Sequence, residues 1–286
     1  MDREEMKVKI RNIRNLPTLS TVANQIKRVT SESESSAQDL ANAVVIDQSL
    51  SAKILNLANS AFFGFSHHIA TIPQAVVVIG FDEVKNLALG VSVYETLSPS
   101  ADEVSFDRKA FWMHTVGCAT ACKLIARELG YRDPGIFMAG LLHDLGKVVL
   151  DRYFHEQYQK VVQILVKERR PAMDVEMEVL NINHAEVGGW LAFRWKFPEV
   201  LVASIENHHD LVSSNEEYLK EALIVHLANV LTKRAGIGLC YETPFPEPNP
   251  MVQTHLHLSP EIVTSITDEL QDHRDGISEF FGHMRE

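Results

Sequence analysis

The chain has 286 residues, of which 45% are hydrophobic and 23% are charged, a composition typical of one large or two small globular domains. Its 38 acidic residues outnumber 27 basic ones, and the net charge of -11 argues against nucleic acid or an anionic membrane as a general partner. The longest apolar run, Ala75 to Phe81, is too short to cross a bilayer. Three cysteines without metal-finger spacing, Cys118, Cys122 and Cys240, fit free thiols in a reducing cytoplasm, where we expect the protein to reside.

The first third of the chain has the pattern of several short helices. Apolar residues recur at helical spacing in four segments, residues 39–47, 50–60, 73–79 and 82–97. Asp82 fits the N-cap of the last of these. The polar segment 98–105 interrupts the pattern, and we place a boundary there between subdomains 1–100 and 101–286. Because short helices seldom bury enough apolar surface to fold alone, residues 1–100 in isolation are expected to be largely unfolded.

Longer helices follow the polar segment. The periodicity predicts them over residues 106–129, 184–195, 199–209, 218–234 and 260–281. Asp133-Pro134 is typical of the start of one more helix, which would carry His143, Asp144 and Lys147. No alternating strand pattern is sustained anywhere, so the sequence predicts an all-α fold.

The most informative stretch sets His143 and Asp144 side by side within an apolar run. An isolated ionised carboxylate is expensive to bury, so Asp144 needs a compensating charge, and a divalent cation can supply it. Four further histidines lie on neighbouring predicted helices, most of them on inward faces: His114, His184, His208 and His209. Imidazoles with one carboxylate suit zinc, iron, manganese or nickel, whereas calcium and magnesium prefer mainly oxygen ligands.

Plainer interpretations exist for each of these residues. A lone inward histidine is more often a hydrogen-bonded core residue than a ligand, and an adjacent His-Asp pair can be a surface dyad. The doublet His208-His209 can simply complement a helix dipole at a C-terminus. What favours a metal site is that five histidines and an aspartate fall on four successive helices of one subdomain.

The order of these residues resembles that of a known superfamily. His114, His143-Asp144-x-x-Lys147, His184 and His208-His209 are similar to the HD superfamily of metal-dependent phosphohydrolases, with spacing closest to its HD-GYP branch. Further segments resemble the HDOD family, the HD-related output domain of bacterial signalling proteins. These segments are Leu16-Pro-Thr-Leu, Asp47 to Ala61, Ile72-Pro-Gln-Ala-Val, Ile79-Gly-Phe and Trp195-Lys-Phe-Pro198. The resemblance runs from about Asn15 to about Arg234 and implies an HD-like helical core with an additional N-terminal helical subdomain.

The resemblance also implies a site. Its catalytic relatives hold one or two transition-metal ions, typically iron or manganese, that activate a water for attack on a phosphodiester. Carried over by position, the ligands are His143, Asp144, His184, His208 and His209, with His114 completing the first ion's shell. Asp144 would bridge two ions, and Lys147 matches the lysine that contacts a substrate phosphate. These two residues are the candidates for a catalytic role.

Two departures from the catalytic pattern stand out. The HD-GYP branch follows its histidine doublet with a Gly-Tyr-Pro loop, but here Asp210-Leu-Val-Ser-Ser follows His209. The closing carboxylate of catalytic HD proteins falls at Asn229, and a neutral amide is a weaker metal ligand. Both departures speak against an active enzyme: the missing loop argues against hydrolysis of cyclic dinucleotides, and Asn229 should lower the metal affinity.

Two functions of different classes therefore remain open. The preferred one is a bacterial signalling module that is non-catalytic or weakly catalytic, retains its metal and binds a signalling protein, with room for a small phosphate-bearing ligand. The alternative is a metal-dependent phosphohydrolase or phosphodiesterase that acts on a nucleotide. Neither class requires nucleic acid or a membrane as a partner.

Overall fold

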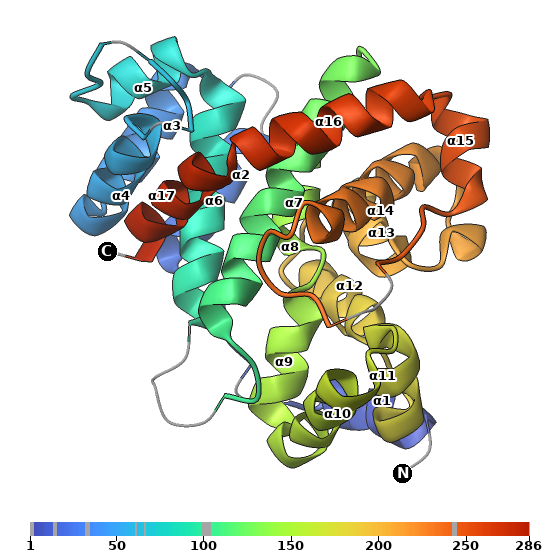
Figure 1. Ribbon diagram of the computed structural model, residues 1–286. Coiled ribbons are helices and arrows are strands. Elements are labelled where there is room, and N and C mark those ends of the chain that lie inside the picture. Colours follow the sequence, from blue (N-terminus) through green and yellow to red (C-terminus); the bar gives the residue numbers. More distant parts are fainter. Residues whose placement is uncertain are drawn as a thin grey trace. The chain divides into compact units, whose positions relative to one another are not determined.

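All regular elements of the described chain are helices (Figure 1). A computed structural model describes residues 3–13, 16–31, 35–60, 62–65, 67–98, 104–241 and 245–285. No strand occurs in these ranges, which confirms the predicted all-α class. None of the helices within them is long and apolar enough to cross a membrane.

The chain divides into two compact units. Unit 1 comprises Met1–Leu16 and Ser100–Asp272, and unit 2 comprises Pro17–Pro99 and His273–Glu286. The break near residue 100 lies where the polar segment 98–105 suggested a boundary. The division proposed at residue 100 differs from the structure at both ends of the chain. The first helix belongs with the second half of the chain, and the last helix belongs with the first half. Both exchanges bury apolar side chains that short terminal helices could not bury alone.

Unit 2 is built from short helices with well-formed N-termini. They are α2 (Thr21–Ser31), α3 (Ala37–Val45), α4 (Gln48–Ala58), α5 (Ile72–Val78), α6 (Phe81–Leu97) and α17 (Arg274–Arg285). Ser36 and Asp39 form a reciprocal capping box on α3, and Asp47 accepts a hydrogen bond from the Leu50 N–H on α4. Asp82 was predicted to be the N-cap of α6, but that position is taken by Gly80. Asp82 lies in the first turn of the helix and pairs with Lys85 at 2.6 Å.

The last helix contributes to the core of unit 2. Four of its side chains are buried: Ile277, Phe280, Phe281 and Met284. The ring of Phe280 lies 5.0 Å from that of Phe62, and Phe281 meets Tyr94 edge-on at 6.1 Å. Such aromatic pairs add about 0.5–1.5 kcal/mol each beyond the area they bury.

A fragment of residues 1–100 is therefore expected to be largely unfolded, because it lacks α17 and its four buried side chains. Circular dichroism and thermal melting of this fragment test the expectation, with the full chain as the control. A cooperative melting transition of residues 1–100 would contradict it. If the fragment is unfolded as expected, adding residues 273–286 as a separate peptide should raise the helix signal above the sum of the two parts.

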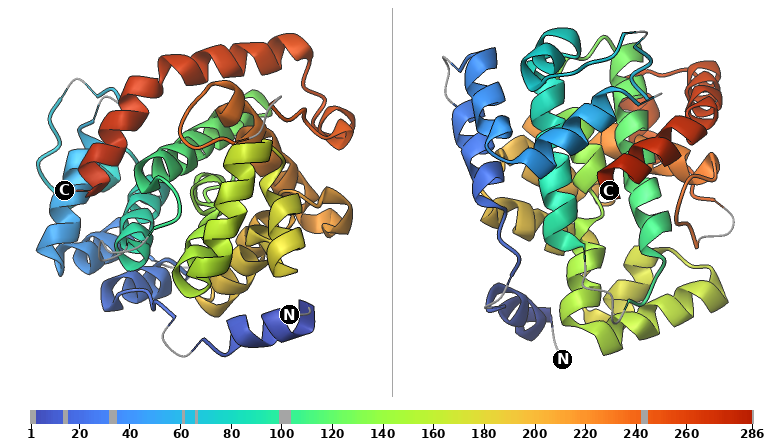
Figure 2. Two further views of the ribbon diagram at one scale, coloured as in Figure 1. Left: turned by 60° about the horizontal axis from the view of Figure 1, so that its bottom comes forward. Right: turned by 90° about the vertical axis from the view of Figure 1, so that its left-hand side faces the viewer.

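Unit 1 contains the helices predicted over residues 106–129, 184–195, 199–209 and 218–234, together with others that were not predicted. They are α1 (Arg3–Arg11), α7 (Arg108–Glu128), α8 (Ile136–Leu142), α9 (Leu145–Tyr153), α10 (His155–Glu168), α11 (Ala172–Leu180), α12 (His184–Arg194), α13 (Glu199–Asn207), α14 (Leu219–Arg234), α15 (Pro250–Leu256) and α16 (Pro260–Asp272). The long helix α7 packs against α8, α14 and α16 (Figure 1). Figure 2 shows α1, in dark blue, alongside other helices of the same unit, where Arg3 pairs with Glu186 of α12 at 2.8 Å.

Two of the helix crossings in unit 1 depend on glycine. A Cβ added at Gly146 of α9 would lie 1.9 Å from the carbonyl oxygen of His184, the first residue of α12. A Cβ at Gly140 of α8 would lie 2.7 Å from the Cα of Ala119 on α7. Any larger residue at either position would push backbone against backbone. These contacts hold α7, α8, α9 and α12 close enough for their polar side chains to meet.

Candidate metal centre

His143 and Asp144 lie at a junction between two helices. The sequence predicted one helix through this segment, but α8 ends at Leu142 and α9 begins at Leu145. Asp144 is the N-cap residue of α9, with φ of -99° and ψ of 8°, and both residues are buried. The junction turns the carboxylate of Asp144 toward the histidines of the neighbouring helices.

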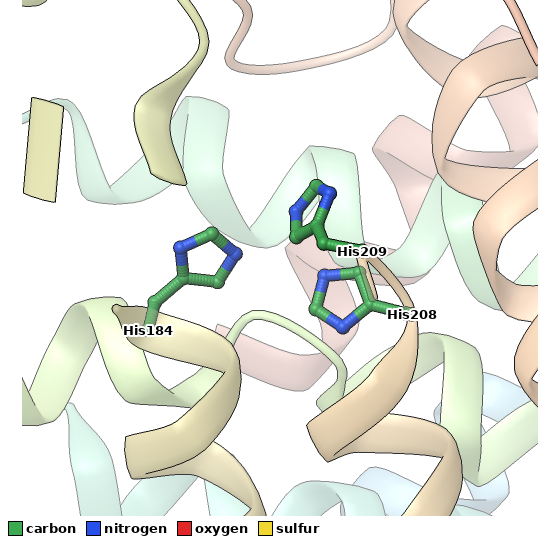
Figure 3. A group of neighbouring side chains, drawn as sticks. All are labelled: His184, His208 and His209. Atoms are coloured by element: carbon green, nitrogen blue, oxygen red, sulfur yellow. The ribbon is translucent and has the colours of Figure 1, made fainter. Parts of the chain in front are cut away.

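The other predicted histidines come from three helices of unit 1. His114 is buried on α7, and His184 is the first residue of α12, whose N-cap Asn183 accepts from the Glu186 N–H. His208 and His209 directly follow α13. Figure 3 shows His184 facing this doublet across a short gap. The structure thus gathers all five histidines and Asp144 into two adjoining groups, His114–His143–Asp144 and His184–His208–His209.

Asp144 is central to the cluster. Its Oδ2 lies 3.4 Å from Nε2 of His143 and 3.8 Å from Nε2 of His114. Its Oδ1 lies 3.1 Å from Nε2 of His184 and 3.9 Å from Nε2 of His208. Each oxygen therefore faces a different group of histidines, so Asp144 could contribute a ligand to a cation held by either group.

The second nitrogen of three rings is fixed by a hydrogen bond. Nδ1 of His143 lies 2.8 Å from the carbonyl oxygen of Gly140, and Nδ1 of His208 lies 2.7 Å from that of Ile205. Nδ1 of His184 lies 2.6 Å from Oε2 of Glu176. Oxygen can only accept in these contacts, so each Nδ1 carries a proton and each ring turns its Nε2 toward Asp144.

Wherever a ring is neutral, this arrangement leaves an Nε2 acceptor facing the acceptor oxygens of Asp144. Nε2 of His143, His184 and His208 and both ring nitrogens of His114 are buried and make no hydrogen bond. Buried polar atoms are rarely left without a partner, and Nε2 atoms that converge on a carboxylate need a proton or a metal cation between them. The donor set of imidazoles and one carboxylate fits a divalent transition metal, which His114, His143, Asp144, His184, His208 and His209 could hold.

The pKa values of the cluster describe its protonation without a metal. Burial lowers the pKa of His114, His208 and His209 well below the usual histidine value, so these rings are neutral near pH 7. Burial also lowers the pKa of His143, but Asp144 and Cys118 together outweigh it and raise this pKa to about 10, so His143 carries a second proton when no metal is bound. Burial would raise the pKa of Asp144, yet the charges of His143 and Lys147 hold it well below its usual range.

Lys147 pairs directly with Asp144. Its Nζ lies 2.6 Å from Oδ2 of the carboxylate, one turn away on α9. The ammonium group also lines a cavity of about 30 Å³ together with Lys233, Tyr158 and Tyr241. A space of that size holds about two water molecules, far less than the roughly 300 Å³ of a small-molecule site.

Asn229 lies on α14, which packs against α7, α8 and α13. Its side-chain oxygen is buried and makes no hydrogen bond. That state is compatible with an oxygen directed at a cation, and the role of Asn229 as a ligand stays a prediction.

Sequence reasoning missed two residues that support the histidines. Glu176 of α11 binds His184, and His226 of α14 places its Nδ1 2.8 Å from the carbonyl oxygen of His208. The other ring nitrogen of His226 accepts from the Asn249 N–H at 3.0 Å. The only sequence signal for either was an isolated polar residue within an apolar helical pattern, which is too common to be informative.

The chain is similar to several bacterial proteins. A protein named "Uncharacterized protein" from Treponema pallidum (strain Nichols) is 28% identical over 222 residues, which cover 76% of this chain and 42% of that protein. The chain thus spans less than half of that relative. The structure of an HDOD domain protein with unknown function from Geobacter sulfurreducens is 23% identical, covers 98% of both chains and has a TM-score of 0.81.

A second solved structure, of a protein named "Putative phosphohydrolase" from Shewanella amazonensis SB2B, is 22% identical, with a TM-score of 0.77 and coverage of 98% of this chain and 97% of that one. At such identities the two structures establish a shared fold. The HDOD domain family itself matches residues 16–211, which are more than half of the sequence and include the whole histidine cluster. The chain therefore belongs to the HDOD family.

Proposed function

We propose that this chain is a signalling module that keeps a transition-metal site and hydrolyses phosphoesters weakly or not at all. The observation that supports this proposal best is the burial of most of the cluster. His114, His143, Asp144, His184 and His208 are each at most 1% exposed, while His209 is partly exposed. A site that must admit and release a nucleotide needs an opening, and the neighbouring cavity of about 30 Å³ is too small for one.

The proposed metal is iron or manganese, in one or two copies, with zinc or nickel as alternatives. Such an ion would lower the pKa of a bound water and polarise a phosphoester oxygen. The chain's own residues would hold the ion through Nε2 atoms of fixed orientation and through Asp144, which balances its charge. In the signalling role, loss or gain of the ion would change the packing of α7, α9, α12 and α13 around it.

A second candidate function is a metal-dependent phosphohydrolase. The observation that favours it is the pair of cationic side chains, Lys147 and Lys233, at the cavity beside Asp144. Two ammonium groups there could bind a phosphate if the cavity widened. After the same widening, the cavity would accept a small phosphate-bearing regulator in the signalling role.

We also propose a protein partner for the signalling role. Unit 2 exposes four aliphatic side chains around the end of α3 and on α5: Val45, Ile46, Val77 and Val78. These two helices contact each other within the unit. Exposed apolar groups that gather on adjoining helices often mark protein interfaces.

Turnover measurements separate the two functions. The wild-type protein is loaded anaerobically with iron or manganese and incubated with phosphomonoesters, phosphodiesters and nucleotides. The His143→Ala variant serves as the control for contaminating activity. The proposal expects equal, background rates from both proteins together with bound metal in the wild type. Turnover that is well above the variant's would establish the hydrolase instead, and absence of metal from the wild type would contradict both functions.

An Asn229→Asp variant is expected to bind the metal about tenfold more tightly, because a carboxylate adds a hard anionic ligand where the amide is neutral. Calorimetric titration of both proteins at one pH measures the difference. The exposed Asn42→Asp change on α3 adds the same charge to unit 2 and should leave the affinity unaltered. Equal affinities of Asn229→Asp and wild type would mean that residue 229 does not face the cluster.

A further inference from the structure

A second carboxylate is buried behind the histidine cluster. Glu176 of α11 is fully buried, and both of its oxygens are engaged. Oε2 accepts from Nδ1 of His184 at 2.6 Å and from the backbone N–H of His184 at 2.8 Å. Oε1 accepts from the hydroxyl of Tyr158 on α10 at 3.0 Å. A buried carboxylate is tolerated only when its oxygens are satisfied in this way.

The position of His184 in its helix makes this contact specific. His184 is the first residue of α12, where backbone N–H groups have no partner within the helix. The helix dipole also favours a negative charge at this end. Glu176 therefore fixes the main chain of His184 and the orientation of its ring with the same oxygen.

The partner of His184 differs in charge from those of the other oriented rings. His143 and His208 donate to backbone carbonyl oxygens, whereas His184 donates to a carboxylate. A carboxylate behind an imidazole increases the electron density on the opposite nitrogen and holds the tautomer. That opposite nitrogen, Nε2, is the one that lies 3.1 Å from Asp144.

We propose that Glu176, held in place by Tyr158, is a positioning residue that sets Nε2 of His184 toward the bound metal and strengthens it as a ligand. This inference rests on the proposed function, in which the cluster binds a metal. The competing explanation is that Glu176 only ties α10, α11 and α12 together.

Cobalt(II) binding to the full chain distinguishes these explanations. The variants are Glu176→Gln, which keeps the shape and an accepting oxygen but removes the charge, and Tyr158→Phe, which removes only the hydroxyl. Glu178→Gln is the matched control, because Glu178 lies on the same helix but is exposed and pairs with Arg170. Calorimetry gives the cobalt affinity, the visible absorption spectrum reports the ligand field, and thermal melting without metal reports the fold.

Glu176→Gln should weaken cobalt binding about 10- to 100-fold and shift the absorption bands. Tyr158→Phe should cause a smaller loss in the same direction, and Glu178→Gln should match the wild type. Wild-type affinity and spectrum in Glu176→Gln, or in Tyr158→Phe if Glu176→Gln does not fold, would overturn the positioning role even if the melting temperature fell. A wild-type protein that binds no cobalt, iron or manganese would overturn the proposed function, and the positioning role with it.

Discussion

An Asp144→Ala variant is expected to lose transition-metal affinity by more than about 100-fold, the upper end of what changes behind the ligands produce. The reason is that both oxygens of Asp144 face histidine Nε2 atoms, from 3.1 Å at His184 to 3.9 Å at His208. Without the carboxylate, the cluster offers neutral imidazoles beside the ammonium of Lys147, which repels a cation. Equilibrium dialysis against iron or manganese, followed by elemental analysis, measures the loss.

An Asp174→Ala variant provides the control for the Asp144 prediction. Asp174 is an exposed aspartate in the first turn of α11, so its removal changes the net charge equally without altering the cluster. Its metal content should equal that of the wild type. Full metal occupancy in Asp144→Ala would show that the ion is bound elsewhere in the protein.

A Gly146→Ala variant should be destabilised by about 3 kcal/mol or more, at the upper end of the usual range for overpacking. The added Cβ would lie 1.9 Å from the carbonyl oxygen of His184 and 2.9 Å from the backbone nitrogen of Gly188, so α9 and α12 must separate. The higher helix propensity of alanine offsets at most about 1 kcal/mol of this loss of stability. Because α9 follows Asp144 and α12 carries His184, metal affinity should fall together with stability.

Urea unfolding of the metal-free proteins gives the stability change. Gly282→Ala is the matched control, since Gly282 lies inside α17 and a Cβ there meets nothing within 4 Å. That variant should gain up to about 1 kcal/mol from helix propensity. A Gly146→Ala protein as stable as the wild type would mean that the crossing of α9 and α12 is looser than the structure has it.

Helical periodicity was sufficient to predict much of the fold. The expected helices over 106–129 and 184–195 correspond to α7 and α12 within two residues, because apolar spacing of three and four marks a buried helical face. The same reasoning placed His114 and His184 on inward faces, where the structure has them. The family pattern then predicted that residues from separate helices would meet.

Features that depend on contacts between elements were beyond this reasoning. No helix-breaking proline lies in the run Ala139-Gly-Leu-Leu-His143-Asp144-Leu-Gly146, so the sequence does not mark the junction between α8 and α9. Just after this junction, Gly146 packs against the backbone of His184, a contact that only the structure reveals. Glu176 binds His184 across the turn between α11 and α12, which leaves no periodic trace in the sequence. The terminal helix 260–281 proved to be two helices, α16 and α17, because its two halves bury their apolar faces in different units.

Because α17 belongs to unit 2, the core of that unit is completed last during translation. The ribosome delivers residues in order, so Ile277, Phe280, Phe281 and Met284 emerge after every other helix of that unit. Until then, the apolar faces of α4 and α6 lack their last covering helix and are open to non-native contacts during synthesis. Unit 2 thus completes its core only after residue 284 has been translated. Premature termination in the last helix would leave an aggregation-prone, protease-sensitive product.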